Sequence, residues 1–307
     1  MRTARFRRTS SITRTIGGCG ERMGTQPRDP VPLKYFSAWF CPYAHRATLA
    51  LSHHAPIVQY EWEEALGWEK RASRVGEAGS DASAPRDAEF YYHWKAPKLL
   101  EYNASGLVPT LVDEATGRAV TESLVCLEFV DELAASAGAA DETRLIPNDP
   151  FEAARCRVWA DKVNKYCCSP YYGVLVKADE EGRRESFATL LKGLREFAAA
   201  KKGAFFSGAA PSIVDYALLP WAWRYYVLAH YKGKEFAIPH TEDLAPFHAW
   251  LAAMEALPQV ASTLPGKERY LEHVAKYAEA SARSKVANAV RRGAEAHEID
   301  DEKDESV

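Results

Sequence analysis

The residue best suited to chemistry in this sequence is a cysteine in the run Phe40-Cys41-Pro42-Tyr43-Ala44. Apolar patterning predicts a strand over 33–37 and a helix over 42–52, so Cys41 stands at the helix N-terminus. Free backbone N–H groups and the helix dipole favour a thiolate there, and they lower a cysteine pKa to roughly 3.5–7.5. A packed structural cysteine is the alternative interpretation, but the strand-to-helix position favours a reactive thiol.

The residue at position 44 limits what such a thiolate can do. Ala44 stands where a dithiol oxidoreductase has its second cysteine. A lone thiolate cannot resolve its own mixed disulfide, so the chemistry requires an external thiol.

Two further pairs lie at places where backbone groups are exposed to a ligand. Val108-Pro109 opens an expected strand, where a proline is tolerated structurally and where a cis bond would leave the Val108 backbone available to an extended peptide. Glu122-Ser123 precedes an expected helix over 123–135. Ser123 either caps this helix or helps it to bind a carboxylate, while Glu122 either complements the dipole or accepts from an ammonium group.

Histidines and an arginine follow the cysteine. His45 and Arg46 lie one turn beyond Cys41, where they either add positive charge near the sulfur or face solvent. The adjacent His53 and His54 mark the helix end and not a metal site, since adjacent helix residues do not share a face.

The elements around these residues indicate two domains. Strands are expected at 57–62, 108–112 and 119–121, and a short helix at 97–102, with a loop or insertion over 67–86. After a linker over 136–148, helices are expected from 149 to about 166, at 185–200, from 212 to about 231, at 244–256 and at 267–280. Capping boxes begin two of them, at Asp149 and Ser212.

Composition limits the function classes. The 307 residues are 47% hydrophobic and 26% charged, with a net charge of −3. These values are typical of a globular protein that does not bind nucleic acid, and no apolar run is long enough to span a bilayer. Six cysteines without zinc-type spacing predict a reducing compartment and no metal.

The two ends of the chain differ from its centre. Residues 1–30 begin with a basic, Ser/Thr-rich stretch, which predicts a disordered leader or an organelle transit peptide; Met23 is an alternative start. Residues 281–307 are expected to be a charged tail, with seven acidic residues from Glu295 onward. The predicted folded parts are therefore an α/β domain over 31–135 and an all-helical domain over 148–280.

Taken together, these motifs resemble the cytosolic glutathione transferases, in particular the omega-like class with a cysteine active site. The resemblance spans roughly residues 32–271, and the matching stretches are 40–44, 106–109, 121–132, 145–153, 212–216 and Pro220-Trp221. It implies a thioredoxin-like N-terminal domain with a cis Pro109 and an all-α C-terminal domain. The cap at Ser212 and Asp215 is a folding device in this family.

The resemblance also implies a role for each site residue. Cys41 would form a mixed disulfide with glutathione, the co-substrate, beside Phe40. Val108 and Pro109 would bind its cysteinyl part, and Glu122 and Ser123 its γ-glutamyl end. The glycyl carboxylate would pair with Lys95, with Lys98 as the rival because of the insertion. The co-substrate pocket would include Trp221, Arg224 and Tyr225.

The implied activity is glutathione-dependent thiol transfer or reduction, which includes dehydroascorbate reduction and deglutathionylation. The substrate would be a small electrophile or a disulfide. Conjugation of glutathione to an electrophile is disfavoured. That reaction uses a Tyr or Ser hydroxyl to stabilise the glutathione thiolate, and Cys41 takes the place of this hydroxyl. The alternatives are a non-enzymatic interaction module and a soluble form of an intracellular chloride channel protein; a bare glutaredoxin is disfavoured by the helical half. A homodimer is common in the family. The expected location is cytoplasmic, or mitochondrial or plastid if the leader directs import.

Overall fold

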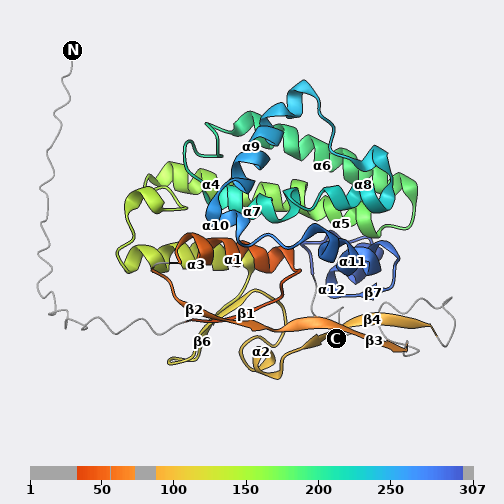
Figure 1. Ribbon diagram of the computed structural model, residues 1–307, viewed down its shortest axis with the longest axis horizontal. Coiled ribbons are helices and arrows are strands. Elements are labelled where there is room, and N and C mark those ends of the chain that lie inside the picture. Colours follow the sequence, from red (N-terminus) through yellow and green to blue (C-terminus); the bar gives the residue numbers. More distant parts are fainter. Residues whose placement is uncertain (1–32, 56, 73–87, 300–307) are drawn as a thin grey trace, which may run out of the picture. The chain divides into compact units, whose positions relative to one another are not determined.

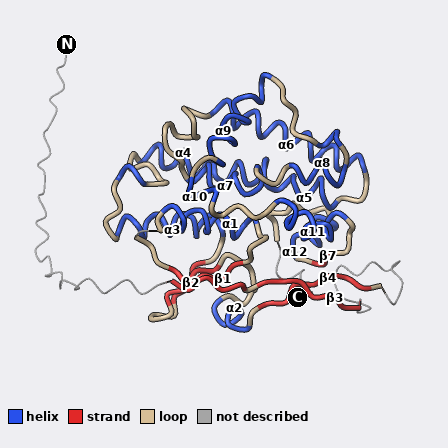
Figure 2. The backbone as a smooth tube through the Cα atoms, in the orientation of Figure 1, coloured by secondary structure: helices blue, strands red, loops and turns tan. Residues whose placement is uncertain are grey.

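The structure is a computed structural model, and it describes residues 33–55, 57–72 and 88–299. The basic leader, most of the expected insertion and the last eight residues lie outside this part. Figure 1 shows helices α1 and α3 over one face of the strand layer and α2 at the opposite face. Most of the remaining helices form a second layer on the far side of α1 and α3, whereas the two C-terminal helices, α11 and α12, lie at the level of α1 in this view (Figure 2).

The α/β half is built on a four-stranded sheet in the order β2-β1-β5-β6. Its strands and helices are β1 Leu33–Ser37, α1 Pro42–His53, β2 Tyr60–Glu64, α2 Pro97–Tyr102, β5 Thr110–Asp113, β6 Arg118–Val120 and α3 Ser123–Ser136. β1 pairs in parallel with β2 and antiparallel with β5. This is the expected thioredoxin-like arrangement, although β2 begins three residues later than predicted.

The segment expected to be a loop over 67–86 instead begins with a strand. β3 (Leu66–Ala72) pairs antiparallel with β4 (Glu89–Lys95), and residues 73–87 lie outside the described part. β4 also pairs in parallel with β7 (Ala282–Arg283), which forms a second, three-stranded sheet. The loop prediction was wrong for β3 because its charged residues obscure the apolar alternation, and its partner strand β4 begins only after residues 73–87.

The helical half follows the linker. It contains α4 Pro150–Val163, α5 Ser169–Val176, α6 Glu180–Ala200, α7 Ile213–Ala222, α8 Tyr226–Lys232, α9 Ala245–Glu255, α10 Pro258–Ala261 and α11 Lys267–Ala278. Short 3₁₀ turns lie at Asp141–Thr143, Lys234–Phe236 and Glu242–Leu244. Both predicted caps form, because Asp149 accepts from Phe151 and Glu152 N–H, and Ser212 and Asp215 make a capping box.

Two predicted helix boundaries in this half were wrong. A π-helical turn, η2 (Asn164–Cys168), follows α4 and leads into α5, which the sequence analysis did not predict. The helix expected from 212 to about 231 is broken between α7 and α8. The Pro220 carbonyl accepts from the Arg224 side chain at 2.5 Å, so a side chain takes the place of the next backbone donor.

The segment from residue 281 is not a simple charged tail. It contains β7 and then α12 (Lys285–Arg291), which begins with Ser284 accepting from Ala287 N–H. Lys285 and Asn288 are buried. The C-terminal segment therefore returns to the α/β half, where β7 extends the β3–β4 hairpin.

Candidate active site

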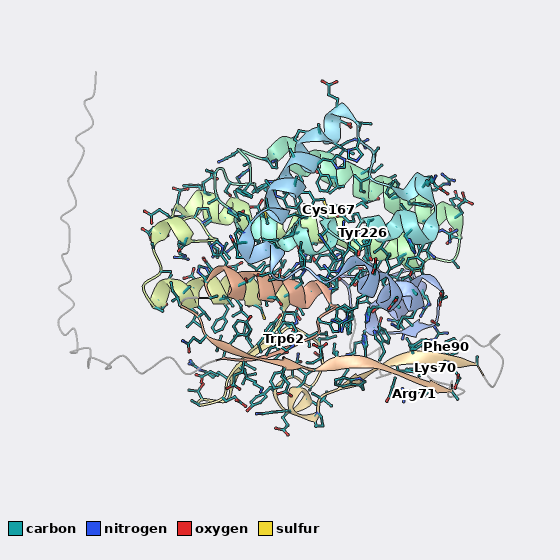
Figure 3. The ribbon with its side chains drawn as sticks, in the orientation of Figure 1. Trp62, Lys70, Arg71, Phe90, Cys167 and Tyr226 are labelled. Atoms are coloured by element: carbon teal, nitrogen blue, oxygen red, sulfur yellow. The ribbon has the colours of Figure 1, made fainter. Side chains whose placement is uncertain are left out.

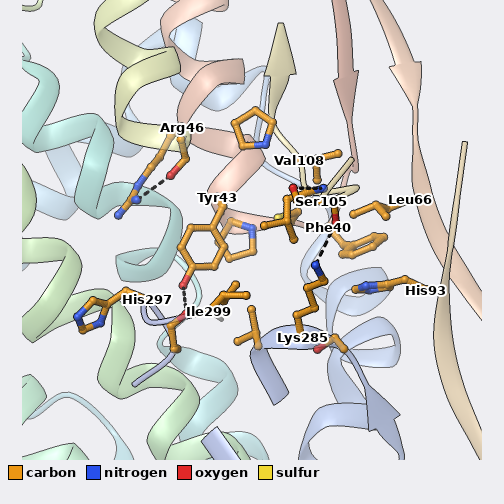
Figure 4. A pocket seen from close by; sticks show the side chains of 18 of the residues that line it. Phe40, Tyr43, Arg46, Leu66, His93, Ser105, Val108, Lys285, His297 and Ile299 are labelled. Carbon is orange, nitrogen blue, oxygen red and sulfur yellow. Dashed lines mark hydrogen bonds between the residues drawn. The ribbon is translucent and has the colours of Figure 1, made fainter. Parts of the chain in front are cut away.

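A cavity of about 450 Å³ lies between the α/β half, the helical half and the C-terminal segment. This volume is in the range of small-molecule sites, about 300–1,000 Å³. Residues that line it include Phe40, Cys41, Tyr43, Arg46, His93, Lys95, Ser105, Val108, Pro109, Glu122, Ser123, Asn164, Tyr172, Tyr270, His273, Tyr277, Lys285, Ala296 and Ile299. Figure 4 shows several of these side chains around the cavity.

Cys41 occupies the N-cap position of α1, as predicted, with an extended backbone (φ −74°, ψ 118°). Its sulfur faces the N–H groups of Tyr43 and Ala44. Cys41 is partly exposed, whereas Cys126, Cys156, Cys167 and Cys168 are buried. Figure 3 shows Cys167 within the helical layer. Among the described cysteines, Cys41 is therefore the one suited to react with a substrate in the cavity.

The expected lowering of the Cys41 pKa is not found. Burial raises the pKa of the Cys41 thiol, and it outweighs the N–H groups of Ala44 and Tyr43 and the positive charges of Arg224 and Arg46. The helix N-terminus does act in the expected direction, but the desolvation of the sulfur is the larger effect. Cys41 thus lies where it was predicted, and only the predicted direction of its pKa shift was wrong.

The α/β wall of the cavity brings together the residues predicted for the cysteinyl and γ-glutamyl parts. The Val108–Pro109 peptide bond is cis. Glu122 has a positive φ of 64° and precedes α3, which begins at Ser123. A non-glycine residue rarely adopts such a φ, and strained positions of this kind are concentrated at functional sites.

Arg46 holds Ser123, at the start of α3, in its place in this wall. Its guanidinium donates to Ser123 Oγ at 3.0 Å, Asn164 Oδ1 at 2.9 Å and the Ala217 carbonyl at 3.0 Å. It is 1% exposed, so the solvent-facing alternative is wrong. The π-helical turn presents Asn164 at this point, and no local pattern of residues predicts that turn.

His45 does not supply positive charge to the sulfur. It is buried, its Nε2 lies 2.9 Å from Thr263 Oγ1, and its Nδ1 lies 3.2 Å from Arg224 Nη1. Burial, followed by the Arg224 charge, holds the pKa of His45 well below its usual range. The imidazole is therefore neutral at ordinary pH and acts as a packing residue.

Of the two lysines considered for the glycyl carboxylate, Lys95 lies at the cavity. Its Nζ donates to the Ser105 carbonyl at 3.1 Å. Lys98 pairs with Glu114 on the surface and does not line the cavity. The insertion therefore does not displace Lys95.

The three residues expected in the co-substrate pocket do not line the cavity. Trp221 and Arg224 are fully buried, and Tyr225 is 3% exposed. Trp221 packs edge-on against Tyr43 at 4.7 Å, and Tyr225 donates to the Cys167 carbonyl at 2.9 Å. Trp221 belongs to α7, and two residues that do line the cavity, Tyr43 and Arg46, pack on its ring.

Other aromatic residues form the wall opposite the α/β half. Tyr172 of α5 and three residues of α11 line it: Tyr270, His273 and Tyr277. The sequence analysis missed them, although the spacing of the α11 residues is a helical one. From the C-terminal segment, the Ala296 carbonyl accepts from the Tyr43 hydroxyl at 3.0 Å.

Two histidines extend this aromatic wall toward the β3–β4 hairpin. His273 stacks on Phe40 at 4.0 Å, and it accepts from Trp68 Nε1 at 3.2 Å. Burial is the main cause that lowers the pKa of His273 to about 2 and that of His93 to about 3. Both rings are therefore neutral at physiological pH, which makes this wall aromatic and uncharged.

Comparison with known proteins agrees with this geometry. Residues 40–133 match the family model of the glutathione S-transferase N-terminal domain, and residues 180–253 match that of the C-terminal domain. The chain belongs to the glutathione S-transferase family. It is accordingly an enzyme of the glutathione transferase kind, and this family uses glutathione as its co-substrate.

The transferase is similar to omega-class members in particular. It is 26% identical to glutathione S-transferase omega-1 of Rattus norvegicus and 28% identical to that of Mus musculus, each match covering 83% of this chain and 90% of the relative. Among solved structures, glutathione transferase Omega 3C from Trametes versicolor is 28% identical, with a TM-score of 0.63 over 83% of this chain and 94% of the other. The predicted family and fold are confirmed.

Two kinds of feature are absent from the described residues of the transferase. None of their helices combines the length and apolarity needed to cross a membrane. Over the same residues, no group of three His, Cys, Asp or Glu side chains is arranged to hold a metal ion.

Proposed function

We propose that this transferase is a glutathione-dependent thiol transferase and reductase in which Cys41 forms a mixed disulfide with glutathione. The observation that carries the proposal is a partly exposed cysteine at a helix N-terminus, on the wall of a cavity that Lys95, Val108 and Glu122 also line. A thiol at this position attacks sulfur or an electrophilic centre directly.

Glutathione would lie along the α/β wall. The backbone of Val108, before the cis bond, pairs with the cysteinyl part of the tripeptide, beside Phe40. The N-terminus of α3, at Ser123, binds the γ-glutamyl carboxylate, and Glu122 accepts a hydrogen bond from the α-ammonium group of the γ-glutamyl residue. Lys95 binds the glycyl carboxylate.

The reaction proceeds by two exchanges. The Cys41 thiolate attacks the glutathione sulfur of a mixed disulfide, a bond forms between the two sulfurs, and the substrate leaves as a thiolate that takes up a proton. A second glutathione, as its thiolate, then attacks the glutathione sulfur on Cys41 and releases oxidised glutathione and the Cys41 thiolate. When the substrate is dehydroascorbate, its reduction takes up two electrons and two protons. Two glutathione molecules supply them, again through the mixed disulfide on Cys41.

The co-substrate would bind against the aromatic wall of Tyr172, Tyr270 and Tyr277. These rings offer apolar faces and phenol hydroxyls, which suits a flat or aromatic electrophile or a small disulfide. Trp221, Arg224 and Tyr225 are not part of this site, because they do not line the cavity.

The decisive experiment compares wild type, Cys41→Ala and Cys126→Ala. Assays follow deglutathionylation of a glutathionylated peptide and reduction of dehydroascorbate, and intact mass reports glutathione bound to the protein. We expect Cys41→Ala to lose both activities and the glutathionyl adduct, whereas Cys126→Ala, which removes a buried thiol away from the cavity, retains them. Equal rates for Cys41→Ala and wild type would remove Cys41 from the mechanism and favour an interaction module.

We also propose a homodimer through α3 and α4. Val125 of α3 and Phe151 and Val158 of α4 are 53%, 86% and 59% exposed. Phe151 and Val158 lie two turns apart on one face, and an Arg157–Glu128 ion pair of 2.9 Å joins the two helices beside them. Apolar residues gathered in this way are typical of a protein–protein contact.

A cytoplasmic location remains our expectation, with import into an organelle as the alternative. The basic leader lies outside the described residues. Imaging of the full chain, fused at its C-terminus to a fluorescent protein, distinguishes the two.

A further inference from the structure

Two arginine side chains beside the first turn of α1 are fully buried, and the proposed exchanges use the charge of neither. Arg224, in the break between α7 and α8, is 0% exposed, and Arg46 of α1 is 1% exposed. A guanidinium keeps its proton at any ordinary pH, so both groups carry a full positive charge inside the protein. Burial of a charge without a partner of opposite sign is strongly unfavourable. The two charges therefore call for a compensating negative charge.

Among the described residues, the hydrogen-bond partners of both guanidiniums are neutral groups. Arg224 Nη1 donates to the Pro220 carbonyl at 2.5 Å and to Nδ1 of His45 at 3.2 Å. The Nε and Nη2 of Arg224 make no hydrogen bond within the described part of the chain. Arg46 donates to the Ala217 carbonyl, Ser123 Oγ, Asn164 Oδ1 and Cys168 Sγ. These neutral partners offset the charges only in part, and least for Arg224.

His45 and Tyr270 place the Arg224 guanidinium close to Cys41. His45 follows Cys41 by one helical turn, and its N–H donates to the Cys41 carbonyl at 3.0 Å. Residues so spaced lie side by side on a helix, with their Cβ atoms about 5–6 Å apart. The same guanidinium lies over the ring of Tyr270, 4.6 Å from its centre, and Tyr270 lines the same cavity as Cys41. The charge is thus held between the first turn of α1 and the cavity wall.

Most titratable side chains around the Cys41 sulfur are uncharged at neutral pH, because burial raises the pKa of the phenols and lowers that of the imidazoles. They are Tyr43, His45, Tyr172, Tyr270, His273 and Tyr277. The charged groups that line the cavity besides Arg46 include Lys95, Glu122 and Lys285. Arg224, followed by Arg46, is the charged side chain that acts most on the pKa of Cys41, and both lower it against the larger effect of burial.

The second of the proposed exchanges creates a negative charge at this place. Glutathione, as its thiolate, attacks the glutathione sulfur on Cys41. A bond forms between the two glutathione sulfurs, the disulfide bond to Cys41 breaks, and its electron pair stays on the Cys41 sulfur. The negative charge thus moves from the incoming glutathione to a buried sulfur near Arg224. A positive charge already fixed there offsets the desolvation of the thiolate without any rearrangement.

We propose that Arg224 is a positioning residue for the thiol chemistry, whose fixed charge stabilises the Cys41 thiolate both as nucleophile and as leaving group. This role rests on the proposed function, since it gives Arg224 a part in those exchanges. It replaces the expected place in the co-substrate pocket, because Arg224 does not line the cavity. The neutral His45 holds the guanidinium through Nδ1, while its Nε2 donates to Thr263 Oγ1 at 2.9 Å.

The pH profile of Cys41 alkylation tests this role. Modification by iodoacetamide is followed by mass spectrometry on the peptide that contains Cys41. The proteins are wild type, Arg224→Met, Arg224→Lys and Arg184→Met, and circular dichroism reports whether each is folded. Arg184 is an exposed α6 residue outside the cavity, so its replacement is the control for net charge.

We expect the midpoint of the profile to rise by about one pH unit in Arg224→Met. Alkylation at neutral pH should then be about threefold slower, because greater nucleophilicity of the more basic thiolate offsets part of the roughly tenfold loss of thiolate. Release of the glutathionyl adduct by glutathione should slow as well, since a more basic thiolate leaves less readily. Arg224→Lys, which keeps the charge, should recover most of both rates at neutral pH, and Arg184→Met should equal wild type.

An alkylation profile of Arg224→Met that coincides with that of wild type would overturn the inference. A shift of the same size in Arg184→Met would do so too, since it would reflect net charge alone. If Arg224→Met does not fold, the neutral Arg224→Gln, which keeps N–H donors, takes its place; if neither folds, the guanidinium is a structural group and the inference is wrong. Alkylation requires no glutathione, so a wild type that forms no glutathionyl adduct defeats the proposed function while the profiles still decide the effect of Arg224.

Discussion

The hydroxyl of Tyr43 donates a 3.0 Å hydrogen bond to the carbonyl of Ala296, 253 residues farther along the chain. Tyr43 is two residues from Cys41, and Ala296 is 1% exposed. The bond therefore ties the C-terminal segment to the start of α1 at the reactive thiol. We therefore expect the accessibility of Cys41 to depend on residues that the family match does not cover.

Tyr43→Phe removes this bond and keeps the ring that packs on Trp221. A net hydrogen bond contributes about 1 kcal/mol, so we expect iodoacetamide to alkylate Cys41 roughly fivefold faster in the variant. Tyr166→Phe, at a half-exposed ring outside the cavity, is the control and should react like wild type. A rate for Tyr43→Phe equal to that of wild type would show that the contact does not restrict access.

The pH dependence of Cys41 reactivity follows from the burial that raises its pKa. Only the thiolate reacts, so alkylation should keep accelerating above the ordinary cysteine pKa of about 8.5. A raised pKa in the folded state also means that the thiol form stabilises the fold below the unfolded pKa. That stability is lost as pH rises through the folded pKa.

The measurement is the alkylation rate against pH, together with urea unfolding of wild type and Cys41→Ala at neutral and alkaline pH. Between neutral and alkaline pH, the unfolding free energy of wild type should fall by more than that of Cys41→Ala. A rate that reaches its plateau below neutrality would show that the helix N-terminus, and not burial, controls this thiol.

Asp131→Asn should destabilise the junction between α1, α3 and the linker. Asp131 is fully buried and accepts from His54 Nε2 at 3.1 Å, Arg144 Nε at 2.9 Å and Leu145 N–H at 2.7 Å. Burial acts to raise the pKa of Asp131, but these hydrogen bonds outweigh it and the pKa is lowered. Removal of the charge should cost about 3 kcal/mol of unfolding free energy.

The lowered pKa also fixes the pH at which this stability disappears. It is present above the unfolded pKa of about 3.9 and is lost as pH falls through the folded pKa. Asp131→Asn should therefore show a flatter acid-unfolding curve in this range than the exposed control Asp141→Asn. If the acid-unfolding curves of the two variants run parallel, the protonation of Asp131 is not coupled to unfolding.

The positive φ of Glu122 predicts an unusual order of stability for two variants. A glycine adopts such a φ with less strain than an alanine, so Glu122→Gly should be more stable than Glu122→Ala by about 1 kcal/mol. At the exposed helical position Glu101 the order should be the reverse, also by about 1 kcal/mol. Urea unfolding measures both pairs, and the same order at both positions would exclude strain at Glu122.

The proposed homodimer predicts that Phe151→Asp lowers the molar mass in solution. A charge at this exposed apolar position should disfavour association, and light scattering after gel filtration should report a monomer. Leu100→Asp, on α2 at the other face of the sheet, should leave the mass unchanged. If wild type is a monomer at micromolar concentration, the proposed homodimer is wrong.

The features that depend on local physics could be predicted from the order of the residues. The strand before Cys41, the helix after it and the caps at Asp149 and Ser212 follow from patterning and side-chain chemistry within a few residues. The family motifs added the cis bond at Pro109, but they left Lys95 and Lys98 as alternatives, of which the structure places Lys95 at the cavity. These devices need no distant partner, so they can be recognised in a short stretch of chain.

The features that depend on distant partners could be seen in the folded chain alone. β7 has two residues and no local signal, yet its pairing with β4 brings Lys285 to the cavity. Tyr43 and Arg46 of α1 pack on the fully buried Trp221 ring, and the surrounding elements bury the Cys41 sulfur enough to raise its pKa. Desolvation and pairing depend on everything packed around a group, and a sequence does not show what that will be.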